Sequence, residues 1–219
     1  MNVLSISLLF ILVFLSFLIP VLLRRHVWKR LFLSIDQDDF DTYFKVLDSF
    51  MSKISFPAFY RENIRLSAYI TQNKEELVKK QINFMETEMR LKREEKQQIL
   101  ERAFYYFIDK RDKNATYDIL QRIKAEDSKK YDFMEIEYEI LMEKKTSRIK
   151  DLEERIEQLK TKSDPVKQEE ISIIIGYYKY LIGLQYGYLQ KDQEKQKFLS
   201  EALKLCEGTG YEDQIRQHM

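Results

Sequence analysis

The residues best suited to nucleophilic or acid–base chemistry are few and far apart. His26 and His218 are the only histidines, and neither has neighbours spaced for a metal site or a catalytic triad. Cys206, the only cysteine, ends an amphipathic pattern and is expected to be a buried apolar residue, since no nearby motif would lower its pKa. We therefore predict no catalytic residue and no enzyme activity.

Acidic clusters raise metal binding as an alternative. Glu135, Glu137 and Glu139 form one cluster, and Glu153 and Glu154 form another. Their surroundings are rich in lysine, so i,i+4 ion pairs on a helix surface are the expected role. The glycines form no phosphate-binding loop. The sequence thus predicts neither a metal nor another cofactor.

Aromatic side chains are dense in two segments, Phe104–Phe107 and Tyr177–Tyr188. A helix with aromatic residues on several faces cannot bury them all in one hairpin, so some are expected to line a surface that binds a protein or peptide. The predicted partner-binding residues are Tyr105, Tyr177 and Tyr180.

The composition predicts that helices position these residues. Only 5 Gly and 3 Pro occur in 219 residues, and 33% of the residues are charged. Sandwiches, barrels and α/β folds use more Gly and Pro in their turns. Residues 31–219 hold 33 basic against 36 acidic residues, a net charge of about −3, so we expect no nucleic-acid partner.

The first segment predicts a single transmembrane helix over Val3–Leu23. These 21 residues carry no charge, and 17 of them are Val, Leu, Ile or Phe. At about 1.5 Å per residue the helix matches a hydrocarbon core of about 30 Å. A cleaved signal peptide is the main alternative, but no Lys or Arg precedes Val3 and Leu22-Leu23-Arg24 is a poor cleavage context. A buried core helix is a further alternative.

The flanking charges predict the orientation of this anchor. The positive charges follow the helix, which places residues 31–219 in the cytoplasm and the amino terminus outside a cell membrane crossed once. The predicted membrane-interface residues form a basic collar, namely Arg24, Arg25, Trp28, Lys29 and Arg30.

Residues 31–219 predict one domain of helical hairpins after an anchor and collar over residues 1–30. Hairpins are expected to end near Met89, Ala125, Lys162 and Cys206, about 36 to 44 residues apart. Asn73 is predicted as an N-cap with Glu76 as its capping-box partner, and Asp164-Pro165 as a helix start. The predicted helices are 39–54, 57–72, 73–89, 92–110, 114–125, 129–144, 147–162, 165–189 and 193–206, with a last helical turn after Gly208.

The segment from Gly176 to Cys206 resembles a tetratricopeptide repeat. Ile182-Gly183 and Tyr186 match the first helix of that family, and Leu199 and Ala202 match the second. Lys195 and Glu207 depart from the usual Ala and Pro.

A second segment fits the same pattern more loosely, through Ala103, Tyr106, Ala115 and Ile119. Residues 202–211 are similar to the closing hairpin of small bacterial tetratricopeptide-like proteins, where a terminal helix covers the last repeat. The resemblance implies an α-α hairpin solenoid in which Gly183 and Ala202 let paired helices approach closely.

These features predict an all-α, membrane-tethered scaffold or adaptor whose helical repeats bind a protein or peptide partner. A self-associating structural membrane component is the alternative, since Ser5, Ser7 and Ser16 allow close helix packing in the membrane and a homo-oligomer is possible. An enzyme or enzyme subunit with an unrecognised helical active site is a third reading.

Overall fold

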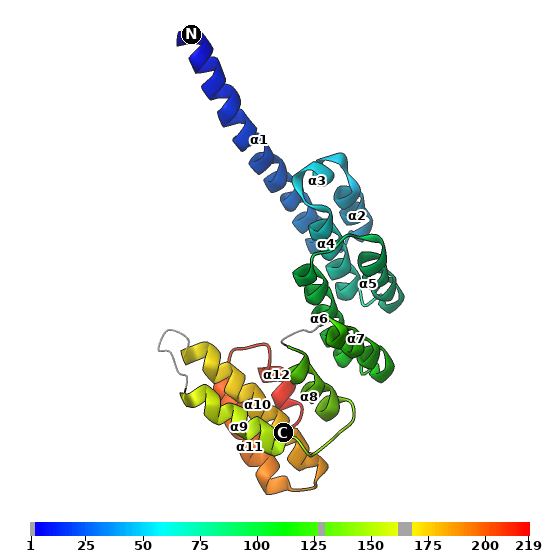
Figure 1. Cartoon of the computed structure of the whole chain (residues 1–219), viewed down its shortest axis with the longest axis vertical. Coiled ribbons are helices and arrows are strands. Elements are labelled where there is room, and N and C mark those ends of the chain that lie inside the picture. Colours follow the sequence, from blue (N-terminus) through cyan, green and yellow to red (C-terminus); the bar gives the residue numbers. More distant parts are fainter. Residues whose placement is uncertain (1–2, 127–129, 162–167) are drawn as a thin grey trace. The chain divides into compact units, whose positions relative to one another are not determined.

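The computed structural model describes residues 3–126, 130–161 and 168–219, and for residues 3–17 it describes the backbone alone. Every regular element in these ranges is a helix, which confirms the all-α class (Figure 1). The helices are α1 Val3–Asp36, α2 Phe40–Asp48, α3 Phe50–Ser55, α4 Ala58–Thr71, α5 Glu75–Glu88, α6 Arg93–Asp109, α7 Lys113–Ala125, α8 Tyr131–Leu141, α9 Ile149–Thr161, α10 Gln168–Tyr188, α11 Asp192–Leu205 and α12 Glu212–Arg216.

The chain forms two compact units, residues 1–103 (unit 1) and residues 104–219 (unit 2). The boundary falls inside α6, so one helix contributes residues to both units. No break in composition marks this point, and the sequence had indicated one domain over 31–219.

The paired helices are joined by a recurring turn. The first helix of a pair ends at a residue in the left-handed region, with φ between 53° and 58°, at Asp38, Asn73, Arg111 and Gln190. The next backbone N–H then bonds the carbonyl five residues before it, as in Asp39 to Ser34 at 2.8 Å. This is the 6→1 bond of a Schellman motif, which satisfies carbonyls at a helix end. Four hairpins, α1–α2, α4–α5, α6–α7 and α10–α11, thus share one turn.

The residue after the left-handed position starts the second helix. At two of the four turns it is an aspartate whose carboxylate accepts a bond from a backbone N–H: Asp39 from Thr42 and Asp112 from Ala115, both at 3.0 Å. At the other two turns, Lys74 and Lys191 occupy this place without a side-chain cap. The turn geometry therefore does not depend on the cap.

Two predictions of helix starts have different outcomes. The predicted N-cap role of Asn73 is wrong, because Asn73 is the left-handed residue that ends the turn (φ 56°) and Lys74 precedes α5. Asparagine tolerates this conformation better than most residues, which explains its position. The Asp164-Pro165 start lies outside the described residues.

The predicted helix over 39–54 is two helices, because the chain breaks at Ser49. Ser49 has extended backbone angles, and its hydroxyl accepts a bond from the Ser52 N–H at 3.2 Å, which caps α3. The apolar spacing continues across the break, so periodicity alone did not reveal it. As a result α3 is an extra helix between two hairpins.

The end of α1 belongs to the core of unit 1. Val27 and Leu31 are buried against Tyr43 and Leu47 of α2. The predicted boundary at residue 30 therefore falls inside a helix whose last turns pack in this core. A fragment that begins at residue 31 would lack Val27.

The collar residues divide into two groups. The Arg24 guanidinium donates to the Ser55 carbonyl at 3.1 and 3.3 Å, and the Trp28 ring contacts the rings of Phe56 and Tyr60. Arg25, Lys29 and Arg30 are exposed.

Within the part of the chain that the structure describes, no helix combines the length and apolar character that a membrane crossing needs. Most of the predicted span, Val3–Leu23, lies where side chains are outside the description, and the span stays a prediction.

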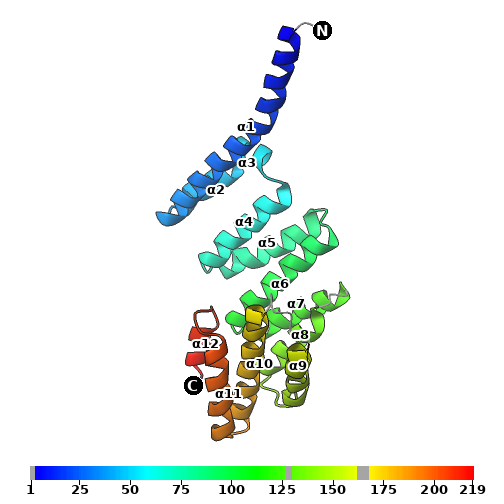
Figure 2. The same cartoon turned by 90° about the vertical axis from the view of Figure 1, so that its left-hand side faces the viewer.

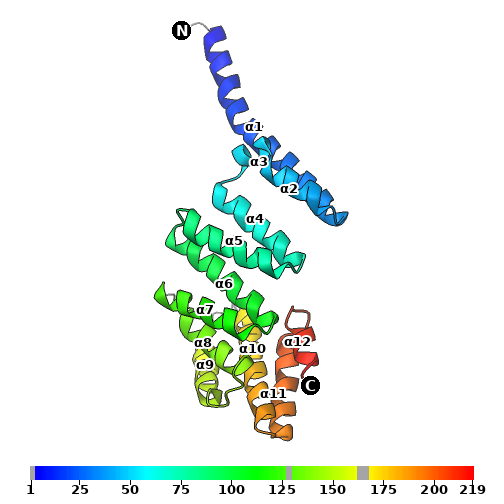
Figure 3. The same cartoon turned by 90° about the vertical axis from the view of Figure 1, so that its right-hand side faces the viewer.

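The α10–α11 hairpin is packed closely (Figure 3). A Cβ atom at Gly183 would lie 2.7 Å from Leu199, and one at Gly176 would lie 2.5 Å from the Cys206 sulfur. Ala202 is fully buried. The predicted close approach at Gly183 is confirmed, and at Gly176 a second close approach brings α10 against the end of α11.

Candidate functional site

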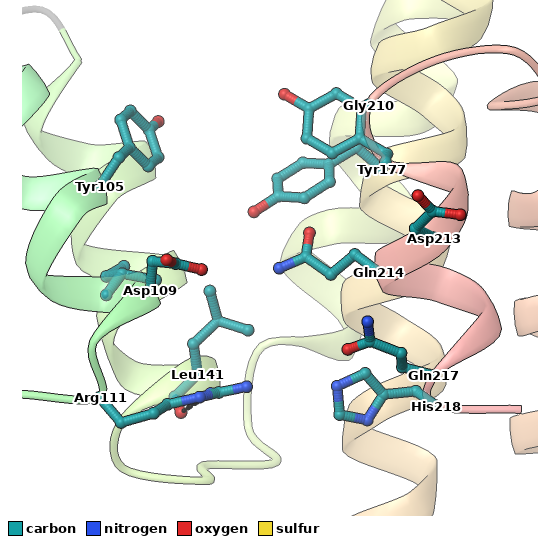
Figure 4. A pocket seen from close by; sticks show the side chains of 12 residues that line it. Tyr105, Asp109, Arg111, Leu141, Tyr177, Gly210, Asp213, Gln214, Gln217 and His218 are labelled. Carbon is teal, nitrogen blue, oxygen red and sulfur yellow. Dashed lines mark hydrogen bonds between the residues drawn. The ribbon is translucent and has the colours of Figure 1, made fainter. Parts of the chain in front are cut away.

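An open pocket of about 640 Å³ lies wholly within unit 2. Side chains from the end of α6, the α6–α7 turn, the end of α8, α10 and the α12 region line it (Figure 4). In Figure 4, Tyr105 lies across the pocket from Tyr177, Asp109 faces Gln214, and Arg111 lies opposite His218. The lining residues are Tyr105, Ile108, Asp109, Arg111, Leu141, Tyr177, Gly210, Tyr211, Asp213, Gln214, Gln217 and His218.

A buried carboxylate fixes two of the lining tyrosines. Glu137 of α8 is 1% exposed and accepts hydrogen bonds from the hydroxyls of Tyr105 at 3.0 Å and Tyr177 at 2.7 Å. A buried charged group is stabilised by such bonds, and it holds the donors in place in return. The two tyrosine rings are thus held in fixed positions at the pocket.

Glu137 departs from the role predicted for its cluster. Glu139 does form ion pairs, with Arg148 and with Lys145 at 2.9 Å. Glu137 instead belongs to the i, i+3, i+4, i+7 stripe formed with Met134, Tyr138 and Leu141, which is buried. That stripe was the signal in the sequence that placed this carboxylate on the inner face.

The environment of Tyr177 disfavours ionisation of its hydroxyl. Burial is the main cause that raises its pKa well above the ordinary value, and the charge and hydrogen bond of Glu137 act in the same direction. Its ring also lies 4.7 Å from the Tyr211 ring, centroid to centroid. Tyr177 is therefore a neutral hydrogen-bond donor within an aromatic cluster.

The floor of the pocket is built by the turn after α6. Arg111 has a left-handed backbone (φ 58°) and donates from its guanidinium to the Leu141 carbonyl at 3.2 Å. Burial lowers the pKa of His218, and the charges of Arg111 and Lys195 lower it further. The imidazole is accordingly kept neutral at physiological pH.

Several side chains at the pocket can form non-covalent contacts with a ligand. Amide side chains of Gln214 and Gln217 can pair with peptide groups, the carboxylates of Asp109 and Asp213 with cations, and the tyrosine rings with apolar side chains. Within the described ranges, no group of three or more His, Cys, Asp or Glu residues is arranged to hold a metal ion.

The three tyrosines predicted to bind a partner have different positions. Tyr105 and Tyr177 both line the pocket, although they come from different helices. Tyr180 is fully buried, with its ring 5.8 Å from the His218 ring, so it presents no surface to a partner. The residues on either side of α12 cover this part of α10, because the Tyr211 ring lies 4.7 Å from the Tyr177 ring and the His218 ring lies beside Tyr180.

Sequence reasoning missed the contribution of the α6–α7 turn and of α12. Arg111 looked like one of many surface cations, and α12 is a helix of 5 residues with no long periodic pattern. Only the expectation of a last helical turn after Gly208 indicated that this region was ordered.

No protein-family model matches the chain, and no curated protein or solved structure matches it either. The resemblance to tetratricopeptide repeats thus stays a prediction from residues 103–119 and 176–206.

Proposed function

We propose that the protein is a membrane-tethered scaffold whose unit 2 binds an extended segment of a protein partner in the 640 Å³ pocket. The observation that carries this proposal is the pair Tyr105 and Tyr177, held by one buried carboxylate at the edge of an open pocket. Aromatic side chains fixed in this way bind with little loss of conformational entropy. The pocket volume falls within the range of about 300–1,000 Å³ that is usual for ligand sites.

The helical-hairpin solenoid is part of the same proposal. The shared turns after α1, α4, α6 and α10 support it, since stacked helical pairs of one geometry build such arrays. The tether is supported by the uncharged sequence of Val3–Leu23 and the basic residues that follow it. The cytoplasmic placement of residues 31–219 is supported by the same charge asymmetry.

Site-specific photo-crosslinking in native membranes tests partner binding. A photoreactive phenylalanine analogue replaces Gln214 in the pocket, and a matched control replaces Lys150 on α9, whose side chain is 87% exposed. We expect a discrete adduct from position 214 and none from position 150. The adduct is lost when Tyr211→Ala is added and kept when Glu154→Ala, an exposed change on α9, is added instead. Identical adducts from both positions, or none, would contradict the pocket.

Flotation with membranes tests the tether. Two arginines at Leu12 and Leu15 add about 2.5–3.5 kcal/mol each to the free-energy cost of insertion. The variant with Leu12→Arg and Leu15→Arg should therefore stay in the soluble fraction and not float with the membranes. Leu12→Val with Leu15→Val is the matched control and stays with the membrane. Release of both variants, or of neither, would contradict a transmembrane anchor.

Labelling with a membrane-impermeant maleimide tests the orientation. Lys150→Cys provides an exposed thiol, while Cys206 is buried and burial raises its pKa. We expect labelling of the variant only after lysis of the cells. Labelling of intact cells would place unit 2 outside.

A further inference from the structure

Helix α3 buries polar residues and exposes apolar ones, which is the reverse of the usual arrangement. Ser52 and Ser55 are buried, whereas Phe50 is 76% exposed, Ile54 56% and Met51 44%. The hydroxyls of Ser52 and Ser55 have no hydrogen-bond partner among the described residues. Exposed apolar patches mark sites where a protein, membrane or ligand binds.

The position of α3 along α1 relates this patch to the predicted membrane. Arg24, the first residue after the uncharged segment, donates to the carbonyl of Ser55 at the end of α3. Figures 1, 2 and 3 all show α3 beside α1 and closer to its N-terminal end than α2 and α4 lie. A bilayer that ends near Arg24 would therefore meet α3 first.

The charge of this region favours an anionic surface. No Asp or Glu occurs between residues 1 and 35 or between residues 49 and 61. Arg25 on α1 and Lys53 on α3 are exposed within these stretches. Basic side chains near a bilayer surface are attracted to anionic headgroups.

Aromatic side chains beside α3 suit the same boundary. A second, smaller pocket of about 340 Å³ is lined by Arg24, Trp28, Phe56, Pro57 and Tyr60. Trp and Tyr are enriched at membrane–water interfaces because their rings are apolar and their edges polar. Tyr60 is exposed, and the Phe56 and Tyr60 rings stack with centroids 5.5 Å apart.

We propose that α3 is a second membrane contact, which lies in the interface of an anionic bilayer with Phe50, Met51 and Ile54 inserted at the boundary between headgroups and acyl chains. This inference rests on the proposed tether. It adds that unit 1 contacts the lipid surface through α3 as well as through the anchor. A short apolar face among basic residues is the pattern of interfacial helices. Its occupant is lipid, because the patch begins where the anchor ends.

Spin-label accessibility on the full chain tests this contact. The chain is placed at one copy per nanodisc of mixed phosphatidylcholine and phosphatidylglycerol, after flotation has shown whether it binds membrane at all. Labels are attached at Phe50→Cys and Ile54→Cys, and a control label at Lys74→Cys reports the α4–α5 turn, which is exposed. Cys206 is buried, and the unsubstituted chain serves as the labelling background.

The proposal expects that collisions of the labels at 50 and 54 with a water-soluble nickel complex fall several-fold relative to the label at 74, while collisions with oxygen rise. In nanodiscs of phosphatidylcholine alone the protection weakens.

If the chain floats but all three labels collide equally with the nickel complex, α3 lies in water and the inference fails while the tether stands. If labels 50 and 54 are protected only when copies are crowded, with spin–spin broadening, the patch is a contact between copies and the inference also fails. A chain that does not float overturns the tether and this inference together.

Discussion

Unit 1 and unit 2 depart from the usual sorting of side chains in opposite directions. In unit 1, α3 exposes Phe50 and Ile54 while it buries two serines. In unit 2, α8 buries the carboxylate of Glu137 while Tyr105, one of its hydrogen-bond donors, is 41% exposed. Both arrangements cost free energy in water, by exposing apolar surface in one case and by desolvating a charge in the other.

The difference indicates two kinds of function. An exposed apolar face gains free energy when a lipid or apolar partner covers it, so it favours attachment. A buried carboxylate with tyrosine donors gains rigidity instead, so it favours selective recognition in the pocket beside it. In the proposed function, unit 1 would hold the protein in place and unit 2 would select what binds.

The largest stability effect in unit 2 is expected from loss of the buried carboxylate. Glu137→Ala leaves a cavity and removes the acceptor for the Tyr177 hydroxyl, so the free energy of unfolding should fall by about 2–4 kcal/mol. Urea unfolding of the full chain in mild detergent, followed by circular dichroism, measures it. Glu154→Ala on α9, where the side chain is 63% exposed, is the control and should change stability by less than about 0.5 kcal/mol. Equal effects of the two changes would show that Glu137 is not a structural acceptor.

The second-largest stability effect in unit 2 is expected at the contact between α10 and the end of α11. A Cβ at Gly176 would lie 2.5 Å from the Cys206 sulfur and 2.9 Å from Leu205 Cβ, so Gly176→Ala should cost about 1–3 kcal/mol through overpacking. At Gly187 the nearest atom is 3.4 Å away, on the flexible Lys195 side chain. Gly187→Ala should therefore be neutral or stabilise by up to about 1 kcal/mol, through helix propensity. The same unfolding measurement compares the two variants, and a stabilising Gly176→Ala would contradict the close packing.

Much of this architecture could be predicted from the sequence because amphipathic periodicity and motif residues are local signals. The α10–α11 hairpin followed from Gly183, Tyr186, Leu199 and Ala202, and the close contact at Gly183 is present. Most predicted helix ends lie within a few residues of those observed.

The misses depend on backbone geometry or on distant contacts. The break at Ser49 comes from one extended residue within a continuous apolar pattern, and Asn73 suits both an N-cap and a left-handed turn. Only part of the pocket could be predicted from the sequence. Tyr105 and Tyr177 were expected to bind a partner, but no local pattern connects them to α12. Tyr180 illustrates the same limit, because the His218 ring that lies beside it comes 38 residues later in the chain.

A smaller, pH-dependent effect should come from the ion pairs of Glu139 on α8. Burial alone would raise the pKa of Glu139, but hydrogen bonds from Arg148 and Lys145 outweigh it and lower the pKa below its ordinary 4.5. A carboxyl whose pKa is lower in the folded state stabilises the fold above the unfolded-state pKa, and this contribution is lost as pH falls through the folded-state value.

Glu139→Gln should therefore cost about 1 kcal/mol at pH 7, since the ion pairs are partly solvated. The difference from the unsubstituted chain should disappear as the pH is lowered below 4.5. Urea midpoints across this range measure the loss, with Lys150→Gln as a control on α9. A difference that stays constant with pH would assign the effect to packing.

The smallest stability effect is expected from the exposed apolar residues of α3, and this distinguishes α3 from a core element. Phe50→Ser and Ile54→Asn each remove an exposed side chain, so unfolding in detergent should change by less than about 0.5 kcal/mol. Leu47, only a few residues earlier, is 1% exposed, and Leu47→Ala should cost about 2–5 kcal/mol. If Phe50→Ser were as costly as Leu47→Ala, Phe50 would be part of the core of unit 1 and unavailable to lipid. If it is nearly silent, its apolar surface contributes nothing to the fold, and the free energy of covering that surface remains available for membrane attachment.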